Sequence, residues 1–209
     1  GEMCGNGARC ICRFAFDQSI APEDMTFETP AGIYWAKVSG MEVKVDMGVL
    51  NLDKAKYNQK INLDDGEIEY NFLEVGVPHC VVYLDVRKTS REELVRIGRT
   101  LRNNAIHFPH GTNVNFVDII DKSHLYLVTY ERGVEDLTES CGTGSAAGAI
   151  ISTILYDMES PITVSNLGGE NKVFIEMKDD LPECELSIQG KALYVAQGVI
   201  CPESFSLRF

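Results

Sequence analysis

Two short motifs in this sequence place a thiol beside glycines: Cys4-Gly5-Asn6-Gly7 and Cys141-Gly142-Thr143-Gly144. The cysteines are 137 residues apart (141 − 4), and each motif leads into a segment that we expect to be helical. A cysteine just before a helix lies beside free backbone N–H groups and the positive end of the helix dipole, which favour the thiolate and lower the cysteine pKa from about 8.5. We therefore predict that Cys4 and Cys141 act as acid/base groups near neutral pH.

The glycines of both motifs leave room for an anion. Without Cβ atoms, they let a carboxylate approach the free N–H groups at each helix start. If two halves of the molecule face each other, the Cα atom of a bound amino acid lies between the thiols. One thiolate then removes the α-proton, and the opposite thiol returns a proton to the other face. Helix dipoles and N–H groups would stabilise the carbanion-like transition state, so inversion at Cα is predicted without pyridoxal phosphate.

Other interpretations of the cysteines are weaker. A lone cysteine is most often a small buried apolar residue, but this does not explain two matching motifs. A thiol oxidoreductase is an alternative because thiols of low pKa also exchange disulfides, yet the sequence has no C-x-x-C pair. Cysteine spacing also fits no zinc site, so we expect no metal and no cofactor. The other cysteines are interpreted as structural: Cys10, Cys12, Cys80, Cys184 and Cys201.

Composition restricts the class of partner. The 209 residues include 31 acidic and 19 basic side chains, for a formal net charge of −12. This charge repels nucleic acid and anionic lipid, and no apolar run approaches the roughly 18 residues of a membrane span. We expect a cytoplasmic protein whose partner is a small amino-acid substrate, with a homodimer left open.

The hydrophobic pattern predicts a sheet-rich α/β fold of the α+β type. Helices are expected near Asn6–Asp17, after a Ser90 cap that has Glu93 three residues on, and from about Gly144 to Asp157. Short runs rich in Val, Ile, Tyr and Phe predict strands. These are Met25–Ala31, Gly32–Val38, Glu42–Met47, Ile68–Val75, Val81–Val86, Asn113–Ile120, Leu125–Tyr130, Val173–Met177, Glu185–Ile188 and Leu193–Val199.

The duplicated motif predicts two pseudo-symmetric halves. Each half would be a mixed or antiparallel sheet wrapped around one central helix. The N-terminal half is assigned to residues 1–48 plus 192–209 and the C-terminal half to residues 49–191, with the boundary near Gly48.

Four segments resemble the family of diaminopimelate epimerases. They are Glu2-Met3-Cys4-Gly5-Asn6-Gly7-Ala8-Arg9-Cys10, Glu28-Thr29-Pro30-Ala31-Gly32, Gly111-Thr112-Asn113-Val114-Asn115-Phe116, and Tyr130-Glu131-Arg132-Gly133 leading to Ser140-Cys141-Gly142-Thr143-Gly144. The resemblance implies two pseudo-symmetric halves that close over the substrate, and epimerisation of LL- to meso-diaminopimelate without a cofactor. Such an activity would serve lysine and cell-wall precursor biosynthesis.

The same resemblance implies roles for individual residues. His79 would assist Cys4, and Glu131 would assist Cys141. Arg132 and Asn113 would grip the distal carboxylate. The N–H groups that would hold the α-carboxylate are those of Gly5, Asn6, Gly142 and Thr143.

Each of these assignments has an ordinary alternative. His79 could be a hydrogen-bonded histidine at a strand start. Glu131 and Arg132 could be a solvated pair at a strand end, and Asn113 a turn or sheet-edge residue.

The sequence departs from the family at two points. Family members carry several dozen residues before the first cysteine, so we expect an incomplete first half whose helix exposes apolar surface. Val77 also stands where the family has Asn before Pro-His, and a lost hydrogen bond to a carboxylate is worth roughly 1.5–3 kcal/mol. The alternatives left open are a related racemase of another amino acid, an inactive truncated homologue, and a non-catalytic binding protein that keeps the fold.

Overall fold

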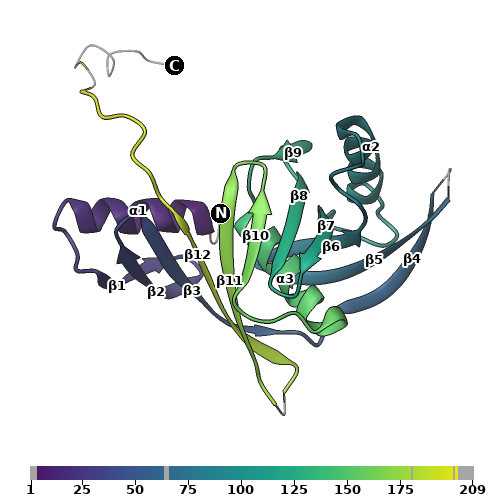
Figure 1. Ribbon diagram of the computed structural model, residues 1–209, viewed down its shortest axis with the longest axis horizontal. Helices are drawn as coiled ribbons and strands as arrows, with labels where there is room; N and C mark the ends of the chain where they lie inside the picture. Colours follow the sequence, from purple (N-terminus) through teal and green to yellow (C-terminus); the bar gives the residue numbers. More distant parts are fainter. Residues whose placement is uncertain (1–3, 64–65, 180, 200, 202–209) are drawn as a thin grey trace.

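The computed structural model describes residues 4–63, 66–179, 181–199 and 201. In this part of the chain, three helices accompany one sheet of twelve strands (Figure 1). In chain order the elements are α1 (Gly5–Asp17), β1 (Asp24–Thr29), β2 (Gly32–Ser39), β3 (Glu42–Asn51), β4 (Lys56–Leu63), β5 (Gly66–Val75), β6 (Val77–Tyr83), α2 (Arg91–Arg102), β7 (Asn113–Asp121), β8 (His124–Glu131), β9 (Asp136–Thr138), α3 (Gly142–Tyr156), β10 (Ile162–Asn166), β11 (Gly169–Met177) and β12 (Glu183–Lys191).

The sheet is mixed, as expected for the α+β class. Its strand order is β1-β2-β3-β12-β11-β10-β8-β7-β6-β5-β4, and β9 pairs with β8. The β6–β7 and β8–β10 pairs are parallel, and the other pairs are antiparallel. Figure 1 shows α1 beside β1, β2 and β3 at one end of the sheet and α3 among the strands of the other part.

Helix α3 forms the centre of the larger core because its sequence is apolar on nearly every side. Ala146, Ala149 and Ile150 have no exposed surface, and the helix contacts β5 to β8 and β10 to β12. A Cβ atom on Gly148 would lie 2.6 Å from Leu127 Cδ1, so a small residue is required where the helix meets β8. Packing thus fixes α3 and the thiol at its start relative to the sheet.

Helix α1 packs on a smaller core at the other end. Ala8 and Cys12 share a buried core cluster with Val43 of β3, with apolar residues of β1 and β2, and with Ala192, which directly follows β12. On the opposite side, Ile11 and Phe14 are 58% and 47% exposed. Apolar side chains are therefore exposed on this side of α1, and the incomplete first half stays a prediction.

Helix α2 covers the sheet from outside. The Ser90 side chain accepts a hydrogen bond from the Glu93 N–H at 3.2 Å, which confirms the predicted cap. Leu94, Ile97 and Leu101 are buried in the core cluster that this helix shares with β7 and β8.

The strand predictions fail at specific places. Residues Leu193–Val199 form no strand, and Val195 and Val199 are 95% and 94% exposed. Their strand-like composition has no effect because β12 ends at Lys191 and no described strand pairs with the segment that follows. Strands β4, β9 and β10 were not expected from the sequence, since they are short or rich in polar residues.

The division into halves stays a prediction. Strand β3 runs through Gly48, and β12 pairs with it from Glu42 to Asn51, with a register shift between Leu186 and Ser187. The sheet is thus continuous across the expected boundary. Residues 1–3, 200 and 202–209 of the proposed first half lie outside the described residues.

Candidate active site

Cys4 and Cys141 are the N-cap residues of α1 and α3. Their backbone angles nearly coincide, with φ −129° and ψ 108° at Cys4 and φ −124° and ψ 109° at Cys141. Each Sγ atom accepts a hydrogen bond from the N–H three residues on, at 3.4 Å from Gly7 and 3.3 Å from Gly144. The two motifs therefore fold in the same way. Each thiol lies beside the free N–H groups at the first turn of its helix.

Both thiols line one cavity of about 260 Å³. Of the residues predicted for the site, only His79 is absent from its lining. The lining residues are Cys4, Gly5, Asn6, Val77, Asn113, Glu131, Arg132, Ser140, Cys141, Gly142 and Thr143. The sheet thus brings together residues that are far apart in the sequence.

The two thiols have different surroundings. Cys4 is exposed, whereas Cys141 is 9% exposed. Burial raises the pKa of Cys141, and the charges of Glu131 and Cys4 raise it further, against the opposing effect of the Thr143 hydroxyl and the Gly144 N–H. The expectation of a lowered pKa is therefore wrong for Cys141 in this geometry, because loss of water outweighs the helix start.

The glycines of the second motif have separate tasks. Gly142 is buried and lines the cavity. A Cβ atom on Gly144 would lie 2.4 Å from Asn115 Oδ1 and 3.0 Å from Thr129 Oγ1, so this glycine is required where α3 meets β7 and β8. From the sequence, both glycines are predicted to leave room for the anion, and no motif indicates the packing role of Gly144.

Asn113 and Arg132 meet where β7 begins and β8 ends. The Arg132 backbone N–H donates to Asn113 Oδ1 at 2.8 Å, and Arg132 Nη1 donates to the His110 carbonyl at 2.7 Å. These bonds hold the guanidinium beside the cavity. Glu131 lines the same cavity, and its charge acts on Cys141.

His79 lies inside the protein on β6. It has no exposed surface, and its Nδ1 is 3.1 Å from Asn115 Nδ2. Burial lowers its pKa to about 3, so the ring is neutral at physiological pH. In the described part of the chain, Nε2 has no hydrogen-bond partner and no bond joins His79 to either thiol. Its assistance to Cys4 stays a prediction.

A second cavity of about 420 Å³ adjoins the first and shares Val77, Arg132 and Thr143 with it. Tyr34 and Met47 of the first strands contribute to its wall. No motif marks Tyr34 or Met47, so pattern reasoning could not have found them.

The described residues contain neither a metal-binding cluster nor a membrane-spanning helix. No group of three or more His, Cys, Asp and Glu side chains is arranged to hold a metal ion among them. Within the same ranges, no helix has both the length and the apolar character needed to cross a membrane.

The chain is similar in sequence to diaminopimelate epimerases and in fold to a solved epimerase. A family model described as diaminopimelate epimerase matches residues 72–195. A diaminopimelate epimerase of Hydrogenobaculum sp. is 34% identical over 206 residues, which are 98% of this chain and 72% of the relative. A diaminopimelate epimerase of Aquifex aeolicus is 36% identical over 205 residues, which are 97% of this chain and 71% of the relative. A solved hydroxyproline epimerase from Agrobacterium vitis shares the fold, with a TM-score of 0.70 at 16% identity over 91% of this chain and 64% of that one.

Proposed function

The chain belongs to the diaminopimelate epimerase family of isomerases, and from that premise we propose that it interconverts LL- and meso-diaminopimelate with two thiols and no cofactor. The observation that carries the proposal is the single cavity lined by both N-cap cysteines. Thiols at two separate helix starts can reach opposite faces of one carbon. The family resemblance implies that this activity would serve the synthesis of lysine and of cell-wall precursors.

The α-carboxylate binds across the two helix starts in this proposal. The first N–H groups of a helix have no partner within it, and the helix dipole favours an anion there. Gly5 and Gly142 line the cavity without side chains that would block the approach. Asn6 and Thr143 supply the next N–H groups, so each half contributes two donors.

Proton transfer then runs between the thiols. The raised pKa of Cys141 supports its role as the proton donor in the resting enzyme, with Cys4 as the thiolate base for the isomer whose α-hydrogen faces it. Cys4 takes the α-proton, and Cys141 delivers its own proton to the opposite face. The protonation states of the thiols are exchanged at the end, which prepares the site for the reverse isomer.

Negative charge builds up during this step. Removal of the α-proton leaves an electron pair that delocalises into the carboxylate, so the carboxylate carries more charge in the transition state than in the substrate. Fixed N–H groups at both helix starts interact more strongly with that larger charge. The cradle therefore lowers the barrier as well as binding the substrate.

The distal end of the substrate extends into the adjoining cavity. Arg132 lines both cavities and is held by its bond to the His110 carbonyl, so its guanidinium can pair with the distal carboxylate. Asn113, bonded to the Arg132 backbone, belongs to the same group. Val77 also lines both cavities and offers no hydrogen bond, which supports a related racemase of another amino acid as the second candidate.

Exchange of the α-proton in deuterated buffer tests the proposal. The protein, kept reduced, is offered LL- and meso-diaminopimelate beside glutamate and lysine, and deuterium at Cα is followed by NMR. We expect deuterium in diaminopimelate because the thiol proton comes from solvent. Exchange confined to another amino acid would establish the second candidate, and no exchange in any of the four would contradict both. The cytoplasmic location expected from the sequence stays a prediction.

A further inference from the structure

Arg9 is a buried charge that the proposed mechanism has not used. It lies on the second turn of α1 and is 6% exposed. Its Nη2 donates to Asn6 Oδ1 at 2.7 Å, whereas Nε and Nη1 are buried and have no hydrogen-bond partner among the described residues. A buried, largely unpaired guanidinium is costly to keep in a fold, so its presence requires an explanation.

The guanidinium lies close to both helix starts. A Cβ atom built on Gly5 would be 3.8 Å from Arg9 Nη1, and one built on Gly142 would be 4.0 Å from the same atom. Both glycines line the thiol cavity. The unpaired side of Arg9 is therefore near the place where the two N–H cradles meet.

The fold itself does not require a charge at this position. The residue that matches Arg9 in the second motif is 137 positions on (9 + 137 = 146), which is Ala146. Ala146 is a fully buried core residue at the corresponding turn of α3. Arg9 therefore breaks the internal symmetry at a buried site.

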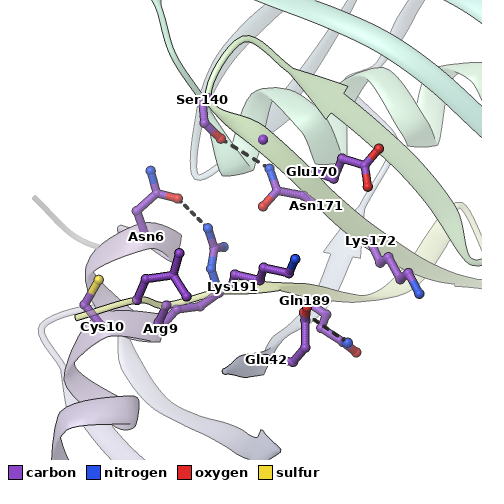
Figure 2. A pocket seen from close by; sticks show the side chains of 14 residues that line it. Asn6, Arg9, Cys10, Glu42, Ser140, Glu170, Asn171, Lys172, Gln189 and Lys191 are labelled. Atoms are coloured by element: carbon purple, nitrogen blue, oxygen red, sulfur yellow. Dashed lines mark hydrogen bonds between the residues drawn. The ribbon is translucent and has the colours of Figure 1, made fainter. Parts of the chain in front are cut away.

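The wider cavity beside Arg9 does not explain why this charge is buried. Figure 2 shows this cavity, of about 510 Å³, with the Arg9 side chain directed toward Asn6. Charges of both signs line it, including Glu42, Glu170 and two lysines. Arg9 itself lines this cavity, but its Nε and Nη1 atoms are buried and donate to none of the other lining residues.

We propose that Arg9 is a positioning residue for the carboxylate cradle, which fixes Asn6 and supplies a buried positive charge that the bound carboxylate neutralises. This inference rests on the proposed function and deepens it. Before the substrate binds, two positive helix ends and one guanidinium lie close together and repel one another. The substrate anion relieves this repulsion. Because charge on the carboxylate grows during proton removal, the effect of Arg9 is larger in the transition state than in the bound substrate.

Two substitutions separate the charge of Arg9 from its hydrogen bond. Arg9→Gln keeps an N–H donor but removes the charge, and Arg9→Lys keeps the charge on a different head group. Loss of a unit charge within a few ångströms of the bound carboxylate is expected to change kcat/KM roughly 10- to 100-fold at effective dielectric constants between those of water and a protein surface. We expect kcat/KM of Arg9→Gln to fall by about that factor, with the larger share of the loss in kcat, and Arg9→Lys to recover most of the loss.

Arg13→Met provides the matched control. Arg13 lies one turn further along α1, pairs with Asp17 and is not in the cavity lining, so its removal should leave kcat and KM within about twofold of wild type. The melting temperature of the substrate-free Arg9→Gln protein should be no lower than that of wild type, because an unpaired buried charge has been removed.

Three results would overturn the inference. They are a Gln variant as active as wild type, a Gln variant that is unfolded or markedly less stable, and equal losses of kcat in the Gln and Lys variants. A wild-type protein without exchange would instead contradict the proposed function, and this inference with it.

Discussion

At the scale of residues, the two thiols share a backbone conformation but differ in solvent access. Both accept a hydrogen bond from a helix N–H, yet Cys4 is exposed and Cys141 is buried. Proximity to a helix start alone therefore does not decide the protonation state of a thiol. In Cys141, burial outweighs the stabilising contacts and favours the neutral form.

Alkylation rates test this difference. Since the pKa of Cys141 is raised, a smaller fraction of it is thiolate near pH 8, and burial further limits access. We expect Cys141 to react with iodoacetamide at least about tenfold more slowly than the exposed Cys201. The ratio of the two reaction rates should become smaller as the pH rises. Mass spectrometry of the two peptides measures both rates in one sample. Faster reaction of Cys141 would contradict the assignment of a resting thiol.

At the scale of elements, the start of α3 depends on a close contact with the sheet. Gly144 faces Asn115 and Thr129, whose side chains are themselves bonded at 3.0 Å. Asn115 also approaches His79. One buried polar cluster thus connects the helix start that carries Cys141 to β6, β7 and β8.

Substitution of Gly144 tests this arrangement. Gly144→Ala would place Cβ 2.4 Å from Asn115 Oδ1 and should destabilise the fold by about 1–3 kcal/mol, because the helix start or the polar cluster must move. Activity should fall with it as Cys141 shifts. Gly7→Ala is the matched control, since among the described residues its Cβ would meet only Cys4, at 3.6 Å, an ordinary contact. Urea unfolding of both variants measures the difference, and equal stabilities would contradict the packing argument.

The sequence predicted an element well where neighbouring residues alone determine that element. The Ser90 cap and the apolar residues of α3 each determine a helix from nearby sequence alone. The segment Leu193–Val199 has the composition of a strand but no strand partner in the described structure. Strand formation depends on a partner strand that is often far along the chain, and the composition of a segment does not reveal that partner.

At the scale of the whole molecule, the site is assembled from distant segments. Cys4, Val77, Asn113, Glu131 and Cys141 come from α1, β6, β7, β8 and α3 and line one cavity. The motifs and the family resemblance identified most of these residues, because their chemistry is visible in the sequence. Burial is not visible there, which is why the neutral state of Cys141 and the packing role of Gly144 could not be predicted.

Cys4 and Cys141 are proposed to act as a pair on opposite faces of one carbon. The most direct measurement follows the interconversion of LL- and meso-diaminopimelate by chiral chromatography in Cys4→Ser and Cys141→Ser, with Cys201→Ser as control. Each single substitution should lower the rate at least about 100-fold, since a proton donor or acceptor is lost, while the control stays near wild type. Near wild-type interconversion by either Cys4→Ser or Cys141→Ser would contradict the two-thiol account.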